Sequence, residues 1–200
     1  MTMQRRTFWQ AAAAWGLLGL VGCGAQGSAT FAGMDMSGSQ QGKDVTPLRD
    51  ADGRPRTLAD FAGKVVVVFF GYVQCPDVCP TTLQELVEAK ALLGAQGDRL
   101  QGVFITVDPT RDTPQVLKAY TQAFGADIVG LTGTPEEIAQ VARDFKVFYK
   151  KVPGRDEASY TIDHSAGMYM YDPQGKLRVY HRYGQGAQAL AQDAKILLAQ

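Results

Sequence analysis

Residues 64–93 have the sequence KVVVVFFGYVQCPDVCPTTLQELVEAKALL, and this stretch decides the fold. Its first seven residues form a continuous β-branched and aromatic run, which is typical of a strand buried on both faces. Residues 80–93 carry leucine and valine at mostly helical spacing, so the stretch predicts a strand, a loop and a helix. The loop holds Cys75 and Cys79. Two thiols at that spacing bind a soft metal or form a disulfide. The function of the protein depends on which of these two reactions the pair carries out.

A proline follows each of these cysteines. Because the residue before a proline disfavours α geometry, Cys75 and Cys79 are both expected to be extended. A helix running through the pair would also place Pro80 in its interior, at a cost of about 3 kcal/mol or more. We therefore expect Cys79 at the N-cap and Pro80 as the first helical residue. The positive end of the helix favours a thiolate there, which both metal binding and thiol chemistry need.

Strands and helices alternate on both sides of this unit. Further strands are expected at 100–107, 128–131, 148–151, 166–171 and 177–180, and helices after Thr113-Pro114, at 135–145 after a capping box at Thr134, and at 187–198. The turn DPQGK joins the last two strands as a late β-hairpin. The pattern predicts a three-layer α/β domain with a mixed central sheet. With a dithiol after the first central strand, it resembles a thioredoxin-like fold, whose sites lie at the carboxyl ends of strands.

His164 is the third chemical element of the sequence, in the segment YTIDHSAG at 160–167. In thioredoxin-like sheets the segment that enters the late hairpin lies beside the dithiol loop, so we expect the imidazole near the two thiols. Two thiolates and one imidazole suit Cu(I) and can hold Cu(II), and zinc would accept the same ligands. Asp163 either orients the imidazole or is an ordinary turn acid. The other histidine, His181, is expected to be exposed on a strand.

Cys23 closes an N-terminal export segment. An arginine pair at 5–6 precedes a charge-free apolar run at 8–20, which is too short to span a bilayer. The residues LVGC at 20–23 resemble the lipobox of bacterial lipoproteins. We expect residues 1–22 to be a lipoprotein signal peptide and Cys23 to carry the lipid that attaches the protein to a membrane. The alternatives are a retained anchor, an ordinary signal with an accidental cysteine, and, for the route, a twin-arginine signal.

Residues 23–44 are interpreted as the lipidated N-terminus and a flexible tether, because the segment is rich in Gly, Ser, Ala and Gln. Met34 and Met36 within it are either linker residues or soft thioether ligands. Residues 45–200 then form the single folded domain. The chain has 20 basic and 20 acidic residues. Loss of residues 1–22 would leave a net charge of about −2, which gives no electrostatic case for binding nucleic acid.

Four ordered segments of the domain resemble the SCO/SenC family of copper-binding proteins. They are GYVQCPDVCPT at 71–81, VDPTRDTP at 107–114, LTG at 131–133 and DHS at 163–165. The resemblance implies a thioredoxin-like domain, facing the periplasm or another extracytoplasmic space, in which Cys75, Cys79 and His164 bind one copper ion, Cu(I) or Cu(II). It also implies a metallochaperone that helps assemble the dinuclear copper centre of cytochrome c oxidase, with the copper-centre subunit and other copper carriers as partners.

Two further functions compete with copper delivery. A thiol-disulfide reductase could act on the cysteines of the copper-centre subunit, but three residues separate the two cysteines here, and no proline stands at His164-Ser165-Ala166. The dithiol can still exchange with disulfides when the metal is absent. A peroxiredoxin-like peroxidase is suggested by VCPT at 78–81, although the threonine and proline expected upstream are missing.

Three other positions leave their roles open. Asp77, between the thiols, contacts a partner, tunes the thiols or favours the turn. Tyr72 is as consistent with packing as with function. We interpret the turn at Asp108–Thr113 as a strand end, an ion pair and a helix cap rather than as an acid and base cluster.

Overall fold

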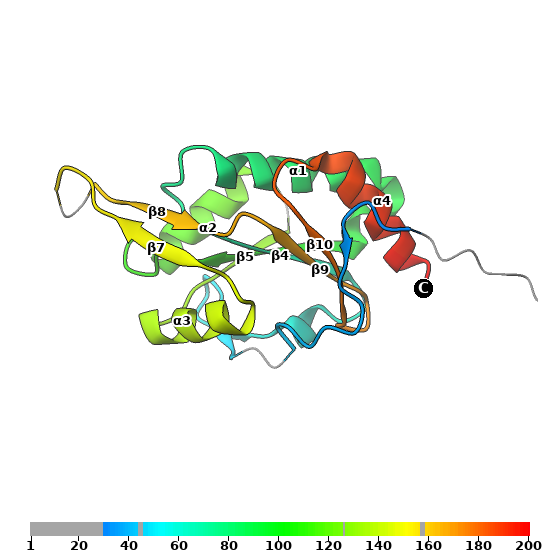
Figure 1. Ribbon diagram of the computed structural model, residues 1–200, viewed down its shortest axis with the longest axis horizontal. Helices are drawn as coiled ribbons and strands as arrows, with labels where there is room; N and C mark the ends of the chain where they lie inside the picture. The colour runs from blue at the N-terminus through cyan, green and yellow to red at the C-terminus, as the bar shows by residue number, and fades with distance from the viewer. Residues whose placement is uncertain (1–29, 44–45, 126, 157–158) are drawn as a thin grey trace, which may run out of the picture.

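The computed structural model describes residues 30–43, 46–125, 127–156 and 159–200 (Figure 1). Its elements, in chain order, are β1 (Met34–Asp35), β2 (Leu48–Arg49), β3 (Pro55–Arg56), the 3₁₀ helix η1 (Leu58–Phe61), β4 (Val65–Gly71), α1 (Val78–Leu92), the 3₁₀ helix η2 (Gly94–Arg99), β5 (Leu100–Thr106), α2 (Pro114–Ala123), β6 (Ile128–Leu131), α3 (Pro135–Asp144), β7 (Tyr149–Val152), β8 (Thr161–His164), β9 (Met168–Tyr171), β10 (Leu177–His181) and α4 (Gly186–Leu198). None of the helices in these ranges is long and apolar enough to cross a membrane.

The central sheet has the strand order β1-β10-β9-β4-β5-β6. Strands β4, β5 and β6 run parallel, whereas β9 is antiparallel to β4 and begins the hairpin with β10. Every residue of β4 is buried because both faces of the sheet are covered. The mixed sheet and the late hairpin confirm the predicted fold class.

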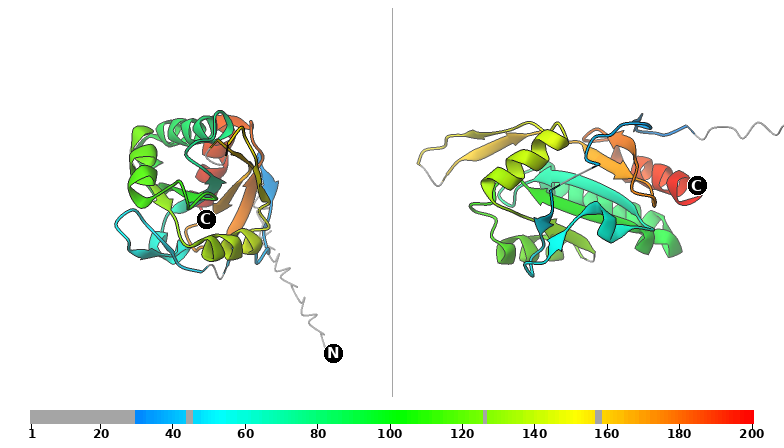
Figure 2. Two further views of the ribbon diagram at one scale, coloured as in Figure 1. Left: turned by 90° about the vertical axis from the view of Figure 1, so that its left-hand side faces the viewer. Right: turned by 90° about the horizontal axis from the view of Figure 1, so that it is seen from below.

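Helices cover the two faces of the sheet unequally (Figures 1 and 2). On one face α1 and α4 pack together, and Leu83 and Leu190 join a core cluster with the odd-numbered valines of β4. On the other face Ile138 of α3 and Phe145, which follows that helix, join a second cluster. This arrangement is the predicted three-layer, thioredoxin-like architecture. It leaves the carboxyl end of β4, where the cysteine loop begins, at the edge of both layers.

Two helix starts follow the sequence closely. Thr113 caps α2 by accepting a hydrogen bond from the N–H of Val116, and Thr134 and Glu137 form the predicted capping box of α3. The start of α1 differs from our expectation, because the helix begins at Val78 with Asp77 at the N-cap. Pro80 lies in the first turn, where its missing N–H removes no intrahelical bond. Cys79 is therefore inside the helix rather than at its cap.

The predicted tether is wrong for residues 30–43, which pack onto the domain. Strand β1 pairs with β10, the last strand at that edge of the sheet. The N–H groups of Ala32 and Gly33 donate to the carboxylate of Asp193 over 2.8 and 2.9 Å, and Phe31 packs against the core. An open sheet edge accepts a short strand of almost any composition, so a Gly and Ser content does not exclude pairing. Residues 23–29, the predicted signal peptide and Cys23 lie outside the described residues.

His181 is also placed differently from our expectation of an exposed residue. Its side chain is fully buried, and its Nε2 lies 3.0 Å from an oxygen of the equally buried Asp193 on α4. Side chains alternate along β10, so His181 shares the inward face with Leu177 and Val179. The flanking Arg178 and Arg182 suggested a solvated strand, but Arg178 lies on the other face of β10 and Arg182 is exposed beyond the end of the strand.

Candidate metal centre

The two cysteines lie at the junction of β4 and α1, as the sequence predicts. Cys75 is half-buried in the loop, whereas Cys79 is fully buried in the first turn of α1. The N–H of Cys79 donates to the sulfur of Cys75 over 3.4 Å, and both thiols are free. A Cβ on Gly71 would lie only 2.6 Å from the Sγ of Cys79. The end of β4 therefore needs glycine so that the buried sulfur can approach the backbone.

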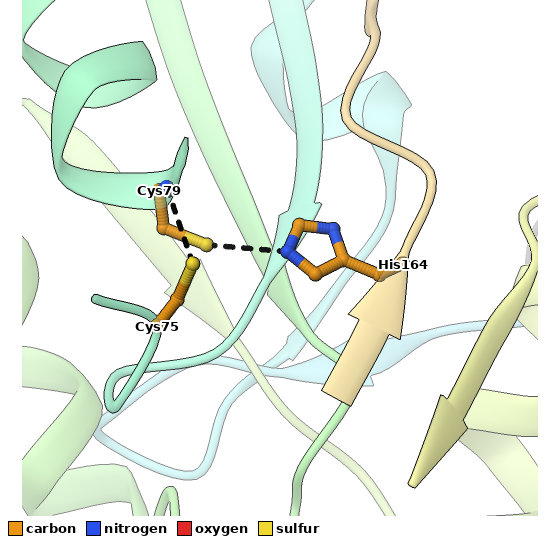
Figure 3. Close-up of side chains that lie close together, drawn as sticks. All are labelled: Cys75, Cys79 and His164. Carbon is orange, nitrogen blue, oxygen red and sulfur yellow. Dashed lines mark hydrogen bonds between the residues drawn. The ribbon is translucent and has the colours of Figure 1, made fainter. Parts of the chain in front are cut away.

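His164 reaches the thiols from the last position of β8. This strand pairs with β7, and the sequence analysis did not include this hairpin. The imidazole Nε2 lies 3.5 Å from the Sγ of Cys79 (Figure 3). Its Nδ1 lies 3.1 Å from the carbonyl oxygen of Ser165. When a metal ion is bound, donation from Nδ1 to that oxygen would leave the lone pair of Nε2 free to ligate the ion beside the sulfurs.

Cys75, Cys79 and His164 each place one ligand atom within 4.8 Å of the others (Figure 3). Among the described residues, no other group of three or more histidine, cysteine or acidic side chains is placed to hold a metal ion. The donors are two soft sulfurs and one imidazole nitrogen, a set that suits copper or zinc with at least one position open.

Aromatic side chains form the inner wall of this site. The rings of Tyr72 and Phe69 lie edge-on to the His164 imidazole, with centroids 5.9 and 6.1 Å away. The hydroxyl of Tyr72 accepts a hydrogen bond from the N–H of Ile162 over 3.2 Å. Tyr72 therefore links β8 to the end of β4 and also packs against the imidazole of His164. The sequence placed this residue beside the cysteines but did not reveal the bond.

The two thiols have opposite acidities. Hydrogen bonding from Cys79, then from His164 and from the N–H groups of Cys79 and Asp77, lowers the pKa of Cys75 to about 4, although partial burial opposes the shift. Its hydrogen bond with Cys75, together with burial, raises the pKa of Cys79 far above the ordinary value. We expected the helix start to favour a thiolate at Cys79. The buried thiol instead donates to its neighbour, so that the metal-free dithiol carries its negative charge on Cys75.

A cleft of about 460 Å³ opens onto the site. Its lining comes from both sides of the metal centre, namely Tyr72, Cys75, Pro76, Asp77, Val78, Thr161, Ile162, Asp163 and His164. Cys75 and His164 are therefore accessible, whereas Cys79 lies behind them.

The two acids singled out in the sequence lie at the rim of this cleft. Asp77 is exposed at the start of α1 and forms no side-chain cap bond with it. Asp163 is exposed too, and among the described contacts of His164 the Nδ1 partner is Ser165 rather than Asp163. The carbonyl of Ser165, rather than the carboxylate of Asp163, therefore orients the imidazole of His164.

The fold and the site together define the class of protein, a thioredoxin-like domain with a dithiol after the central strand β4 and a histidine that faces it from the end of β8. A family model described as SCO1/SenC matches residues 38–199, and the chain belongs to this family. The mouse protein named SCO2 homolog, mitochondrial, is 37% identical over 150 residues. That match covers 74% of this chain and 59% of the mouse protein, so the chain spans little more than half the length of this relative.

Two solved structures share the fold over most of this chain. ScoI of Bradyrhizobium japonicum with copper bound has 38% sequence identity and a TM-score of 0.70, with 77% of this chain and 98% of that chain covered. ScoI of Arabidopsis thaliana with copper bound has 32% identity and a TM-score of 0.72, with 78% and 98% covered.

Proposed function

We propose that this protein is an extracytoplasmic copper metallochaperone that binds one copper ion through Cys75, Cys79 and His164. Its acceptor would be the subunit that carries the dinuclear copper centre of cytochrome c oxidase, and other copper carriers would supply the metal. The observation that carries the proposal is the meeting of three soft donor atoms within 4.8 Å at the mouth of an open cleft. The two copper-bound relatives of the same fold support it.

The donor set explains why Cu(I) fits the site. Thiolates are soft ligands that favour Cu(I), and an imidazole nitrogen beside them can also support Cu(II). Binding requires both thiols to lose their protons, so the copper ion would displace the proton that Cys79 retains in the metal-free protein. Cys75 lies nearest the solvent and is the ligand that an incoming thiolate of the acceptor can replace first.

A competition titration with a Cu(I) chelator under anaerobic conditions tests this proposal. The reduced protein should take up one equivalent of Cu(I), and His164→Ala should weaken the binding severely. Met34→Ala is the matched control, because Met34 offers an exposed soft thioether away from the site. Unchanged affinity in the His164 variant would remove histidine from the ligand set, and loss of affinity in the Met34 variant would point to a different set.

Thiol-disulfide reduction is the second candidate, favoured by the unequal acidity of the thiols. The Cys75 thiolate would attack a disulfide sulfur of the acceptor, forming a mixed disulfide and releasing one acceptor thiolate. Cys79, after losing its proton, would attack the sulfur of Cys75 and release the second acceptor thiol. A Cys75–Cys79 disulfide would remain, and two electrons would have passed to the acceptor. A buried, protonated Cys79 argues against a peroxidase that uses Cys79 as its nucleophile.

Attachment to a membrane in the periplasm through lipid on Cys23 completes the proposal. Its support is the arginine pair, the apolar run and the lipobox-like residues of the first 23 positions. Cys23→Ser should move the protein from the membrane fraction to the soluble fraction if the lipid is the anchor. Retention of this variant in the membrane would favour an uncleaved apolar anchor instead.

A further inference from the structure

Arg111 lies in the turn after β5, which the sequence analysis interpreted as a strand end, an ion pair and a helix cap. Its side chain is only 14% exposed and forms an ion pair with the almost fully buried Asp108. The guanidinium also donates from Nη1 to the side-chain oxygen of Gln74 over 2.8 Å and to the carbonyl oxygen of Tyr160 over 3.0 Å. These bonds place one cation between three segments that are distant in sequence.

Two of those segments carry the metal ligands. Gln74 is the residue before Cys75, and Tyr160 is the residue before β8, whose last residue is His164. Arg111 therefore bridges the cysteine loop and the histidine strand. The guanidinium carbon also lies 3.5 Å from the ring centroid of Tyr160, so the cation stacks on that ring as well as bonding to its backbone.

The turn that presents Arg111 is itself held firmly. Asp108 accepts a hydrogen bond from the hydroxyl of Tyr160 over 2.8 Å through the oxygen that does not face Arg111. Asp112 is buried and accepts from the N–H of Val73, in the cysteine loop, over 3.0 Å and from the hydroxyl of Thr106 over 2.6 Å. The turn is thus bonded to β5, to the cysteine loop and to the segment before β8.

We propose that Arg111 is a positioning residue for the copper site, holding the cysteine loop and β8 at the separation that lets Cys75 and His164 bind the same ion. The inference rests on the copper-binding function proposed above. Only a guanidinium has the planar set of donors to serve Asp108, Gln74 and Tyr160 together. A lysine would keep the charge but could not make this array of bonds.

Cu(I) affinity in two variants tests the role directly. Arg111→Gln should weaken Cu(I) binding by about 10- to 100-fold, the range found when groups that orient metal ligands are removed. Arg111→Lys should give a smaller loss. Arg49→Gln is the matched control, because Arg49 pairs with Glu137 on the surface, 53% exposed. Equal affinity of the wild type and both Arg111 variants would overturn the proposal.

A double-mutant cycle separates positioning from general loss of structure. If Arg111 acts by aligning His164 with the thiols, Arg111→Gln should cost less than about threefold in affinity once His164→Ala is present. The same loss in both backgrounds would show that Arg111 does not act through this alignment. Cu(II) spectra give an independent readout, since a change in ligand geometry shifts the thiolate charge-transfer band. A change in urea stability with an unchanged band would mean a structural role alone.

Gln74→Ala is the milder variant, to be used if loss of Arg111 prevents folding. It removes only the bond to the cysteine loop from an exposed side chain, and it should lower Cu(I) affinity by a few-fold without changing urea stability. Wild-type affinity in this folded variant would contradict the bridge. Failure of the wild type itself to bind one Cu(I) would overturn the proposed function, whereas tight binding in all Arg111 and Gln74 variants would overturn only the positioning role.

Discussion

The two histidines of this protein flank the β9–β10 hairpin in the sequence, one before β9 and one at the end of β10, and they have opposite surroundings. His164, on the strand before the hairpin, is half-buried and faces two thiols across an open cleft. His181, at the end of the hairpin, is fully buried and faces the carboxylate of Asp193. The comparison teaches that residue type alone does not distinguish a ligand from a structural group. Soft partners and an open cleft indicate ligation, whereas a hard, buried partner indicates a structural contact.

The largest effect should come from the thiols that face His164. Cys79→Ser should weaken Cu(I) binding by about 1,000-fold, since metal-binding free energies of 10–16 kcal/mol shared among a few ligands correspond to roughly 4 kcal/mol for each. Anaerobic chelator competition measures this loss, with Met34→Ala as the control. Because serine is nearly isosteric with cysteine, the variant should stay folded by circular dichroism. Tight binding by folded Cys79→Ser would remove the buried sulfur from the site.

The acidity of the exposed thiol provides the next prediction. The lowered pKa of Cys75 keeps this thiol ionised at neutral pH, so its alkylation by iodoacetamide should rise with pH around a midpoint of about 4. An ordinary cysteine has its midpoint near pH 8.5. Cys79 should resist alkylation because it is buried and protonated. Mass spectrometry of peptides after brief labelling measures both rates. A midpoint above pH 7 for Cys75 would contradict the thiolate assignment.

Replacing each histidine separately should distinguish the metal-binding role of His164 from the structural role of His181. His164→Ala should lower Cu(I) affinity by about 100-fold with little change in stability. His181→Ala should lower the free energy of unfolding by about 3–5 kcal/mol, because it removes the imidazole that faces the buried carboxylate of Asp193.

Urea unfolding and Cu(I) titration of both variants provide the measurements. His181→Gln, which keeps a hydrogen-bond donor, is the milder variant if His181→Ala does not fold. A loss of Cu(I) affinity in folded His181→Gln would contradict the assignment of His164 as the ligand and of His181 as a purely structural residue.

The smallest expected effect is the loss of folding stability at acid pH that follows from protonation of Asp193. Burial opposes ionisation, but the hydrogen bond from His181 and the N–H groups of Ala32 and Gly33 hold its pKa below the ordinary value. A carboxyl with a depressed pKa in the folded state stabilises the protein above the unfolded pKa, and this stabilisation is lost as pH falls. Part of the stability should therefore be lost as the pH falls below the ordinary carboxyl range, where the unfolded chain already binds the proton.

Asp193→Asn removes this titration. The difference in unfolding free energy between the wild type and Asp193→Asn should therefore be largest at neutral pH and should shrink toward pH 2. A difference that does not change with pH would show that the ionised carboxylate contributes nothing specific. Urea unfolding of both proteins at several pH values measures it.

Much of the fold could be predicted because its signals are local. The buried run of β4, the helix caps at Thr113 and Thr134 and the turn at 172–176 each lie within a few neighbouring residues. Strand β1 was missed since its pairing partner lies about 145 positions away, and a tether-like composition conceals it. Strand β8 was missed because it has only four residues and because Tyr72, which bonds it to the end of β4, lies 90 positions away from Ile162.

The sequence by itself determined which groups could form the metal centre: two thiols at a strand-helix junction and a histidine before the late hairpin. It also determined the layered α/β architecture, because periodicity and capping are local properties. Only the tertiary structure decided which thiol carries the charge, that His181 is buried rather than exposed, and what holds the two halves of the site together. Each of these depends on burial and on contacts such as that between Cys79 and His164, which are 85 residues apart. Such contacts set electrostatics and geometry, and no local pattern in the chain encodes them.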